Sequence, residues 1–161
     1  VAMSVDRFLV TPGGLEKMRV RLKQILEFDR PQNVADIEVA RAHGDLRENA
    51  EYHAAKERQG HLDYEMRDLK DKIGRAQVVD PATLSGEKVV FGATVVLLNV
   101  DTDEEQTWRV VGEDEGDAAS GAISYKAPLA QAMIGRGEGD EIVFKAPGGA
   151  RTYEILEVRF S

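Results

Sequence analysis

The chain has 161 residues, a formal net charge of −8 and no cysteine. So acidic a chain is not expected to bind naked nucleic acid in general, because such binding needs a basic surface that neutralises phosphates. Without cysteine there is no disulfide framework and no thiolate metal site. No apolar run approaches transmembrane length, and Val1 to Asp6 lacks the features of a signal peptide. We therefore expect a cytoplasmic protein with no membrane partner.

The first part of the chain has the pattern of a long helix. Thr11 is suited to cap its start and Pro12 to occupy its first position, where a missing N–H costs nothing. Pro31 interrupts the apolar spacing and predicts a kink, because proline removes a backbone hydrogen bond. The apolar positions are Leu15, Met18, Leu22 and Ile25 before the kink, and Val34, Ile37 and Ala40 after it.

A second helical segment follows, with mostly apolar side chains at alternating steps of three and four residues. This is the heptad pattern of a coiled coil, sustained over about three heptads. The positions between are mostly charged, so the two segments are expected to pair as an antiparallel hairpin. The second seam consists of Tyr52, Ala55, Gln59, Leu62, Met66, Leu69, Ile73 and Ala76.

The expected hairpin is long for so short a chain. From Leu15 to Gly44, a helix rising about 1.5 Å per residue would extend for about 45 Å. A globular domain built from the second half of the chain would have a radius of gyration of only about 12 Å. The hairpin is therefore expected to project from that domain.

Two acids, Asp45 and Glu48, lie where the hairpin must reverse. On a helical turn, this spacing would place their Cβ atoms about 5–6 Å apart, close enough for two carboxylates to share one Mg²⁺. Such a site would be weak unless a partner supplied further ligands. The alternative is structural: Asp45 caps the second helix and Glu48 completes a capping box. The residue pattern alone leaves both open and favours the structural alternative, since acids are common at helix starts.

Basic residues and histidines surround the two acids. Arg41, Arg47 and Lys56 could form salt bridges along a solvated hairpin, or a small positive patch that holds a phosphate chain beside a metal. His43 and His53 flank the acids, but their spacing matches no standard zinc motif, so solvated histidines are the better interpretation.

The second half of the chain changes to short β-rich runs punctuated by glycine. We expect strands over residues 94–99, 106–111, 122–125, 141–145 and 151–160. Residues 128–134 follow the pattern of a short helix with proline at its first position. In the last strand, Tyr153 and Ile155 alternate in one phase and Val158 and Phe160 in the other, which predicts a bulge near Leu156.

These patterns predict an α+β protein with two domains. Residues 1–79 are assigned to an antiparallel coiled-coil hairpin with an acidic tip. Residues 80–161 are assigned to a small antiparallel sheet with one short helix. We expect the protein to be a monomer.

Residues 44–55 (GDLRENAEYHAA) resemble the tip motif of the bacterial Gre transcript cleavage factors, the GreA/GreB type. The similarity extends to Arg30-Pro31 and to residues 91–95 (FGATV) and 104–112 (EEQTWRVVG), and it is closer to the GreA branch than to GreB. The motif is long and specific, and the resemblance covers most of the chain.

The resemblance implies an FKBP-like topology for the second domain and RNA polymerase as the partner. In that family the second domain binds the rim of the polymerase secondary channel, and the hairpin enters the channel where backtracked RNA extrudes its 3′ end. Asp45 and Glu48 match the acids that help to hold a second Mg²⁺ there, so the protein would stimulate cleavage by polymerase and not be an enzyme itself. Arg41, Arg47 and Lys56 match positions near the RNA.

One departure from the family pattern concerns rim binding, which the resemblance assigns to Ala127, Pro128 and Leu129. The family usually has serine where this chain has Ala127, and alanine is a poorer helix cap by about 0.5–2 kcal/mol. Two other functions remain open: an inhibitor that blocks the channel, and a prolyl isomerase. The retained acids argue against the first, and the scattered aromatic residues of the second domain argue against the other.

Overall fold

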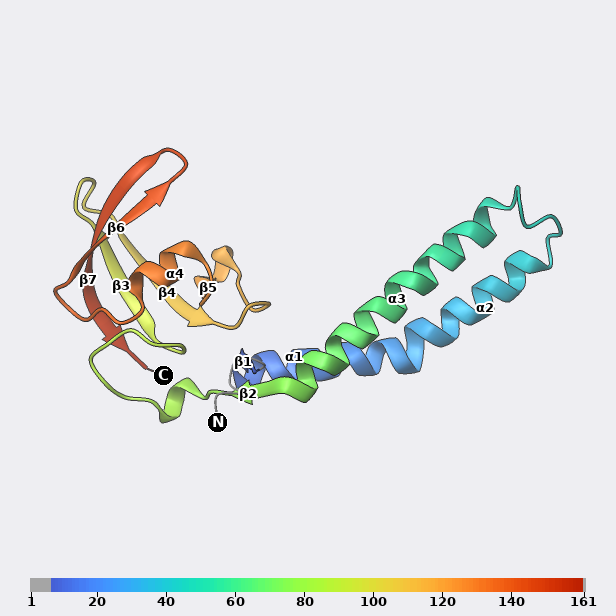
Figure 1. Cartoon of the computed structure of the whole chain (residues 1–161), viewed down its shortest axis with the longest axis horizontal. Helices are drawn as coiled ribbons and strands as arrows, with labels where there is room; N and C mark the ends of the chain where they lie inside the picture. The colour runs from blue at the N-terminus through green and yellow to red at the C-terminus, as the bar shows by residue number, and fades with distance from the viewer. Residues whose placement is uncertain (1–6, 161) are drawn as a thin grey trace. The chain divides into compact units, whose positions relative to one another are not determined.

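A computed structural model describes residues 7–160 (Figure 1). Contacts between residues divide the chain into two compact units. One unit is Leu15–Ala76, which contains most of the helical hairpin. The other combines the N-terminal segment up to Gly14 with Gln77 and the residues that follow it. The contacts therefore divide the chain at two points, whereas the sequence pattern marks one near residue 79.

The hairpin consists of α1 (Pro12–Gln24), a π-helical turn η2 (Ile25–Asp29), α2 (Arg30–Arg41) and α3 (Ala50–Arg75). In Figure 1, α3 runs back alongside α2 in the antiparallel sense. The predicted cap of the first helix is confirmed, because the Gly14 N–H donates to Thr11 Oγ1 at 3.1 Å.

Side chains along the two predicted seams are buried or half-buried, with one exception. Val34 was expected in the seam but is 53% exposed. Asn33 takes the seam position instead, at 2% exposure, and its Nδ2 donates to the Ala55 carbonyl oxygen at 2.9 Å. This hydrogen bond satisfies a buried amide and joins α2 to α3.

The π-helical turn η2 explains why the seam shifts. The Arg30 N–H donates to the Ile25 carbonyl, five residues back, so the turn holds one residue more than an α-helical turn. An uninterrupted heptad from Ile25 would reach residue 32, and the extra residue moves the seam to Asn33. The irregularity lies just before Pro31, which has no N–H for the carbonyl four residues back. The helical path bends there in Figure 1, where a kink was predicted.

An ion-pair network joins the two arms near this turn. Arg21 donates through Nε and Nη2 to both carboxylate oxygens of Glu65, at 2.7 and 2.8 Å, and through Nη1 to Asp29 at 2.8 Å. The hydrogen bond from Arg21 holds the pKa of the Glu65 carboxyl below its ordinary value, against the opposing effect of burial. Glu65 therefore stabilises the hairpin in its ionised form.

The stability of the hairpin should depend on pH through this network. A carboxylate with a lowered folded-state pKa stabilises the fold above its unfolded pKa of about 4.3, and that contribution is lost as the pH falls through the folded pKa. Because the Arg21 and Glu65 side chains are 39% and 40% exposed, we expect at most about 1 kcal/mol. Thermal unfolding followed by far-ultraviolet circular dichroism should show Arg21→Met less stable than the parent near neutral pH, with the gap closing as the pH falls through the lowered pKa of Glu65.

The matched control for this experiment is Lys23→Met. Lys23 and Glu27 are on the same arm, but their closest charged atoms are 3.9 Å apart and both side chains are more exposed. Lys23→Met should therefore change the unfolding temperature little at any pH. A gap between Arg21→Met and the parent that stayed constant across the pH range would contradict the assigned role of Glu65.

The other unit contains a five-stranded sheet in the order β5-β4-β3-β7-β6. The strands β3, β7 and β6 pair antiparallel, as β3 does with β4, but β5 pairs parallel to β4. The prediction of a purely antiparallel sheet is therefore wrong. The connection 112–121, with the short helix η4 (Ala118–Ser120), returns the chain so that β5 can lie parallel. The strands are β3 (Thr94–Asn99), β4 (Glu105–Val111), β5 (Ala122–Ser124), β6 (Glu141–Ala146) and β7 (Gly149–Arg159).

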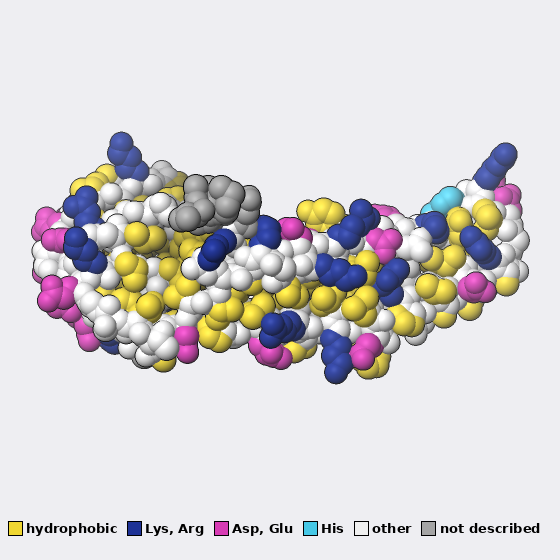
Figure 2. Space-filling view, turned by 60° about the horizontal axis from the view of Figure 1, so that its bottom comes forward, with side chains coloured by type: hydrophobic (Ala, Val, Ile, Leu, Met, Phe, Trp, Pro, Cys, Tyr) yellow, Lys and Arg dark blue, Asp and Glu magenta, His cyan; other side chains and the backbone are white. Residues whose placement is uncertain are grey.

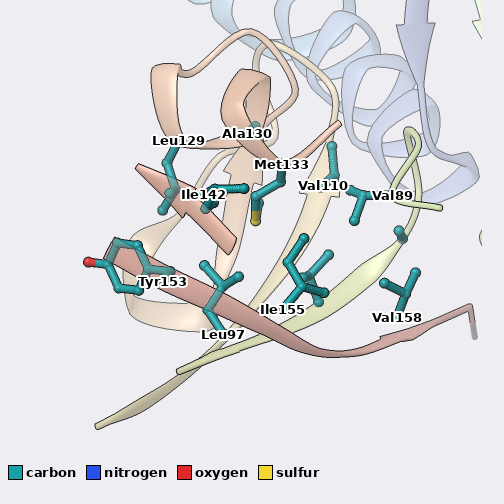
Figure 3. Packing of buried hydrophobic residues seen from close by; sticks show 12 residues of the cluster. Val89, Leu97, Val110, Leu129, Ala130, Met133, Ile142, Tyr153, Ile155 and Val158 are labelled. Carbon is teal, nitrogen blue, oxygen red and sulfur yellow. The ribbon is translucent and has the colours of Figure 1, made fainter. Parts of the chain in front are cut away.

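The predicted bulge in the last strand is confirmed. Val96 faces Glu157 and Leu97 faces Ile155, so Leu156 is the extra residue. The short helix α4 (Pro128–Met133) covers the sheet, and Figure 3 shows Leu129, Ala130 and Met133 facing Leu97 and Ile155 across the core. These contacts make α4 part of the hydrophobic core.

The N-terminal strand was not expected from the sequence. β1 (Phe8–Val10) pairs with β2 (Ala76–Val78), and η3 (Pro81–Thr83) follows. In the unit that contains the sheet, the Glu115 carboxylate accepts hydrogen bonds from the N–H groups of Thr11 and Gly112, each at 3.0 Å. It also accepts one from the Thr11 hydroxyl. Glu115 therefore connects Thr11 to the loop after β4. Among residues 7–160, no helix combines the length and apolarity that crossing a membrane requires.

Candidate functional site: the tip of the hairpin

The tip loop, residues 42–49, connects the end of α2 to the start of α3. The Gly44 N–H donates to the Arg41 carbonyl at 3.2 Å, and Gly44 has φ +104°, a conformation that glycine adopts without strain. This turn ends α2 and directs the chain across to the other arm. Asp45 and Glu48 follow, and both are exposed.

Asn49 closes the tip loop through both ends of its side chain. Its Oδ1 accepts the Tyr52 N–H at 3.0 Å and caps α3, while its Nδ2 donates to the Ala40 carbonyl at 2.6 Å on α2. The structural alternative, in which Asp45 and Glu48 cap the second helix, is therefore wrong. Asn49 satisfies that requirement, which leaves the two acids free of capping.

The Asp45 carboxylate has one local hydrogen bond. Its Oδ1 accepts the Arg47 N–H at 2.9 Å, which makes a tight Asx turn. Asp45 and Glu48 also line a shallow surface pocket of about 410 Å³, together with His43 and Glu51. The His43 Nδ1 lies 3.2 Å from a Glu51 carboxylate oxygen. The pocket therefore presents exposed carboxylates next to an imidazole.

The chemistry of these donors fits Mg²⁺ only in part. Exposed carboxylates are hard oxygen ligands, and Mg²⁺ in proteins takes one or two of them and completes its shell with water or phosphate oxygens. Within the described part of the chain, no group of three or more histidine, aspartate or glutamate side chains is arranged to hold a metal ion. By themselves, Asp45 and Glu48 thus offer only part of the ligand set that Mg²⁺ takes in proteins.

The three basic residues around the acids are all exposed. Arg41 ends α2, Arg47 lies in the tip loop and Lys56 is on α3, where its Nζ donates to Gln59 Oε1 at 2.7 Å. Among residues 7–160, the guanidinium groups of Arg41 and Arg47 form no hydrogen bond or ion pair. Figure 2 shows basic, acidic and histidine side chains mixed at this end of the hairpin. This surface is therefore of mixed charge, and none of these three basic side chains forms a salt bridge within the described residues.

The residues assigned to rim binding lie in the other unit. Ala127 is the N-cap of α4 and forms no side-chain cap hydrogen bond, as expected for alanine. Pro128 is exposed at the first helical position. Leu129 is 8% exposed and belongs to the hydrophobic core. Ala127 and Pro128 therefore offer surface for a partner, while Leu129 holds α4 in place.

Two residues of the tip, Asn49 and His53, form contacts that were not predicted from the sequence. Asn49 precedes Ala50 and is a strongly preferred capping residue, so the sequence held a signal for it. His53 was interpreted as solvated, but its Nε2 lies 3.0 Å from the Arg47 carbonyl oxygen. Nothing in the spacing of the histidines indicates that contact.

Family models and curated relatives match nearly the whole chain. Residues 8–78 match the N-terminal domain of transcription elongation factors, and residues 84–160 match the GreA/GreB C-terminal domain. Transcription elongation factor GreA of Brucella anthropi is 47% identical over 97% of this chain and 99% of its own length. GreA of Desulfotalea psychrophila is 47% identical over 96% of each chain.

Among solved structures, the elongation factor GreA/GreB from Nitrosomonas europaea is 22% identical and has a TM-score of 0.42. The match covers 95% of this chain and 99% of that one. The sequence matches alone are sufficient to assign the protein to a family, since they extend over both units at high identity. The chain belongs to the GreA/GreB family of transcription elongation factors.

Proposed function

We propose that this protein is a transcription elongation factor that binds RNA polymerase in the cytoplasm and stimulates cleavage of backtracked RNA. The observation that carries the proposal is the tip loop, in which Asn49 caps α3 and leaves Asp45 and Glu48 exposed and free of capping. Because neither acid caps a helix, both carboxylates can contribute oxygen ligands to a site on another molecule.

The length of the hairpin suits a deep target. α3 has 26 residues, which at about 1.5 Å per residue amounts to about 39 Å. An arm of that length can carry its tip into a channel such as the polymerase secondary channel. The two helical segments of the hairpin are held together by the seam between α2 and α3 and by the Arg21–Glu65 network.

In the complex, Asp45 and Glu48 would hold Mg²⁺ together with groups of the polymerase active site. The bound ion supplies charge stabilisation and an activated water for hydrolysis. The acids of this chain contribute negative charge and oxygen ligands. The Asp45 oxygen that accepts the Arg47 N–H keeps that carboxylate in a fixed orientation. The protein would thereby promote a reaction of the polymerase without being an enzyme.

The C-terminal unit would supply the binding to polymerase. It would contact the channel rim through half-buried Ala127 and exposed Pro128, and Leu129 would support them from the core. An FKBP-like topology for this unit is part of the same proposal. An isomerase assay on a proline-containing peptide tests the alternative function, and we expect no activity.

The proposal is tested by adding the protein to RNA polymerase stalled in a backtracked position. The RNA should be shortened from its 3′ end faster than by polymerase alone, and the shortened RNA should be extended when nucleotides are supplied. Unchanged cleavage would contradict the proposal. Slower cleavage and slower elongation would favour the channel-blocking inhibitor instead.

The basic residues near the acids should affect engagement with the RNA. Arg41→Gln and Arg47→Gln each remove an unpaired exposed guanidinium, and Lys56→Gln removes an ammonium group from α3. Each substitution should slow cleavage by about 5- to 20-fold, the loss expected for one exposed charge-assisted contact of roughly 1–2 kcal/mol. Crosslinking from the RNA 3′ end to the protein measures the contact directly. Arg19→Gln, at an exposed position far along the same arm, is the control, and unchanged crosslinking in the triple variant would oppose this role.

A further inference from the structure

His53 holds the tip loop by a hydrogen bond to the backbone between the two acids. Its Nε2 lies 3.0 Å from the Arg47 carbonyl oxygen. A carbonyl oxygen can only accept, so the imidazole must carry its proton on Nε2 and donate. The side chain thus extends from the regular helix α3 to the middle of an irregular loop.

The bonded peptide connects directly to both acids. The Arg47 N–H donates to Asp45 Oδ1 at 2.9 Å, so the backbone of Arg47 is held at its N–H by Asp45 and at its carbonyl by His53. The Arg47 carbonyl belongs to the same planar peptide as the Glu48 N–H. Fixing that oxygen therefore fixes the plane from which the Glu48 side chain departs. His53 thereby constrains the backbone of one acid directly and that of the other through the Asx turn.

The His53 ring is itself well supported. Its backbone N–H donates to the Asn49 carbonyl at 3.1 Å in the first turn of α3. Its ring meets that of Tyr52 edge to face, with the centroids 5.7 Å apart, and Tyr52 lies in the half-buried seam of the hairpin. The loop residues 42–48 are all exposed, so apolar packing holds them little. Hydrogen bonds therefore order the loop, and the one from His53 acts on the Arg47 peptide between the two acids, while those of Asn49 act at the end of the loop.

We propose that His53 is a positioning residue for Asp45 and Glu48, acting through the Arg47 carbonyl and touching neither the metal ion nor the RNA. The inference rests on the function proposed above. Residues that orient metal ligands through hydrogen bonds contribute about 10- to 100-fold to metal affinity or activity. Removing the donor should raise the Mg²⁺ concentration for half-maximal stimulated cleavage by about that factor.

The test compares His53→Leu with His53→Gln in the full-length protein, with Mg²⁺ varied in the cleavage assay. Leucine has no donor, whereas the glutamine Nε2 can occupy the place of the imidazole Nε2 and donate to the same carbonyl. His53→Leu should need a higher Mg²⁺ concentration for half-maximal cleavage. His53→Gln should need a concentration close to that of the parent protein. His61→Leu, an exposed histidine on the same helix, is the matched control and should behave as the parent.

Two further measurements separate the possible failures. Helical content and competition for polymerase should be equal in all variants, which excludes loss of fold as the cause. Asp45→Asn is assayed in parallel: if it cleaves like the parent, the proposed function itself fails. If Asp45→Asn is inactive while His53→Leu keeps the parental Mg²⁺ dependence, the positioning role alone is overturned. Equal defects in His53→Leu and His53→Gln would also overturn it, because the donor would then not matter.

Discussion

Asp45→Asn and Glu48→Gln should each reduce stimulated RNA cleavage by about 100-fold or more, with affinity for RNA polymerase nearly unchanged. Both substitutions keep the size of the side chain and remove its charge. In Asp45→Asn the side-chain oxygen can still accept the Arg47 N–H, so the Asx turn is preserved. The cap of α3 is untouched, because Asn49 provides it. Any loss then reflects the missing charge and not a collapsed loop.

Cleavage and binding must be measured on the same preparations. Single-turnover cleavage of backtracked RNA gives the rate, and competition with labelled parent protein gives the affinity for polymerase. Raising Mg²⁺ should partly restore a single variant, because a weakened site fills by mass action. Glu57→Gln, an exposed acid on α3 away from the tip loop, is the control. Loss of binding as large as the loss of cleavage would refute the assignment of these acids to the metal.

Much of the hairpin could be predicted from the sequence, because heptad spacing and burial have the same physical cause. The prediction failed at Val34, where the seam was restarted after Pro31 by choosing the next apolar residue. The π-helical turn before Pro31 adds one residue, and a polar side chain, Asn33, occupies the seam because the Ala55 carbonyl is there to accept its amide. The spacing of apolar residues along the sequence predicts neither the added residue nor the position of that acceptor.

The tip loop shows a different limit. Asp45, Glu48 and Asn49 are all residue types found at helix starts, so the sequence did not decide which one caps α3. Asn49 prevails because an amide can both accept the Tyr52 N–H and donate to the Ala40 carbonyl, which a carboxylate cannot do. The parallel pairing of β5 was missed for a related reason. It depends on the course of the long connection 112–121, which local patterns do not specify.

If the two units are separated, the fragment with the hairpin should keep the ability to stimulate RNA cleavage. The fragment with the sheet should keep most of the affinity for RNA polymerase. A hairpin fragment of residues 11–76 keeps the Thr11 cap, both seams and the tip loop. We expect it to stimulate cleavage only at concentrations about 100- to 10,000-fold above those needed by the full-length protein, because the tether to a bound second unit is lost. The rate at saturation should be close to that of the full-length protein, since the tip acids are unchanged.

The second fragment, residues 77–161, should bind polymerase, compete with the full-length protein and stimulate no cleavage. It should also be less stable than the same unit in the full chain, because it lacks β1, which pairs with β2. The loss of the Thr11 N–H and hydroxyl donors to the Glu115 carboxylate should by itself cost about 1–3 kcal/mol. Glu115→Gln in the full-length protein, which weakens the same contacts without cutting the chain, is the reference for that loss. Titration of each fragment against stalled polymerase measures the division of roles. If the hairpin fragment were as effective as the full-length protein at low concentration, the second unit would not be what binds the protein to polymerase. The hairpin would then supply that affinity itself.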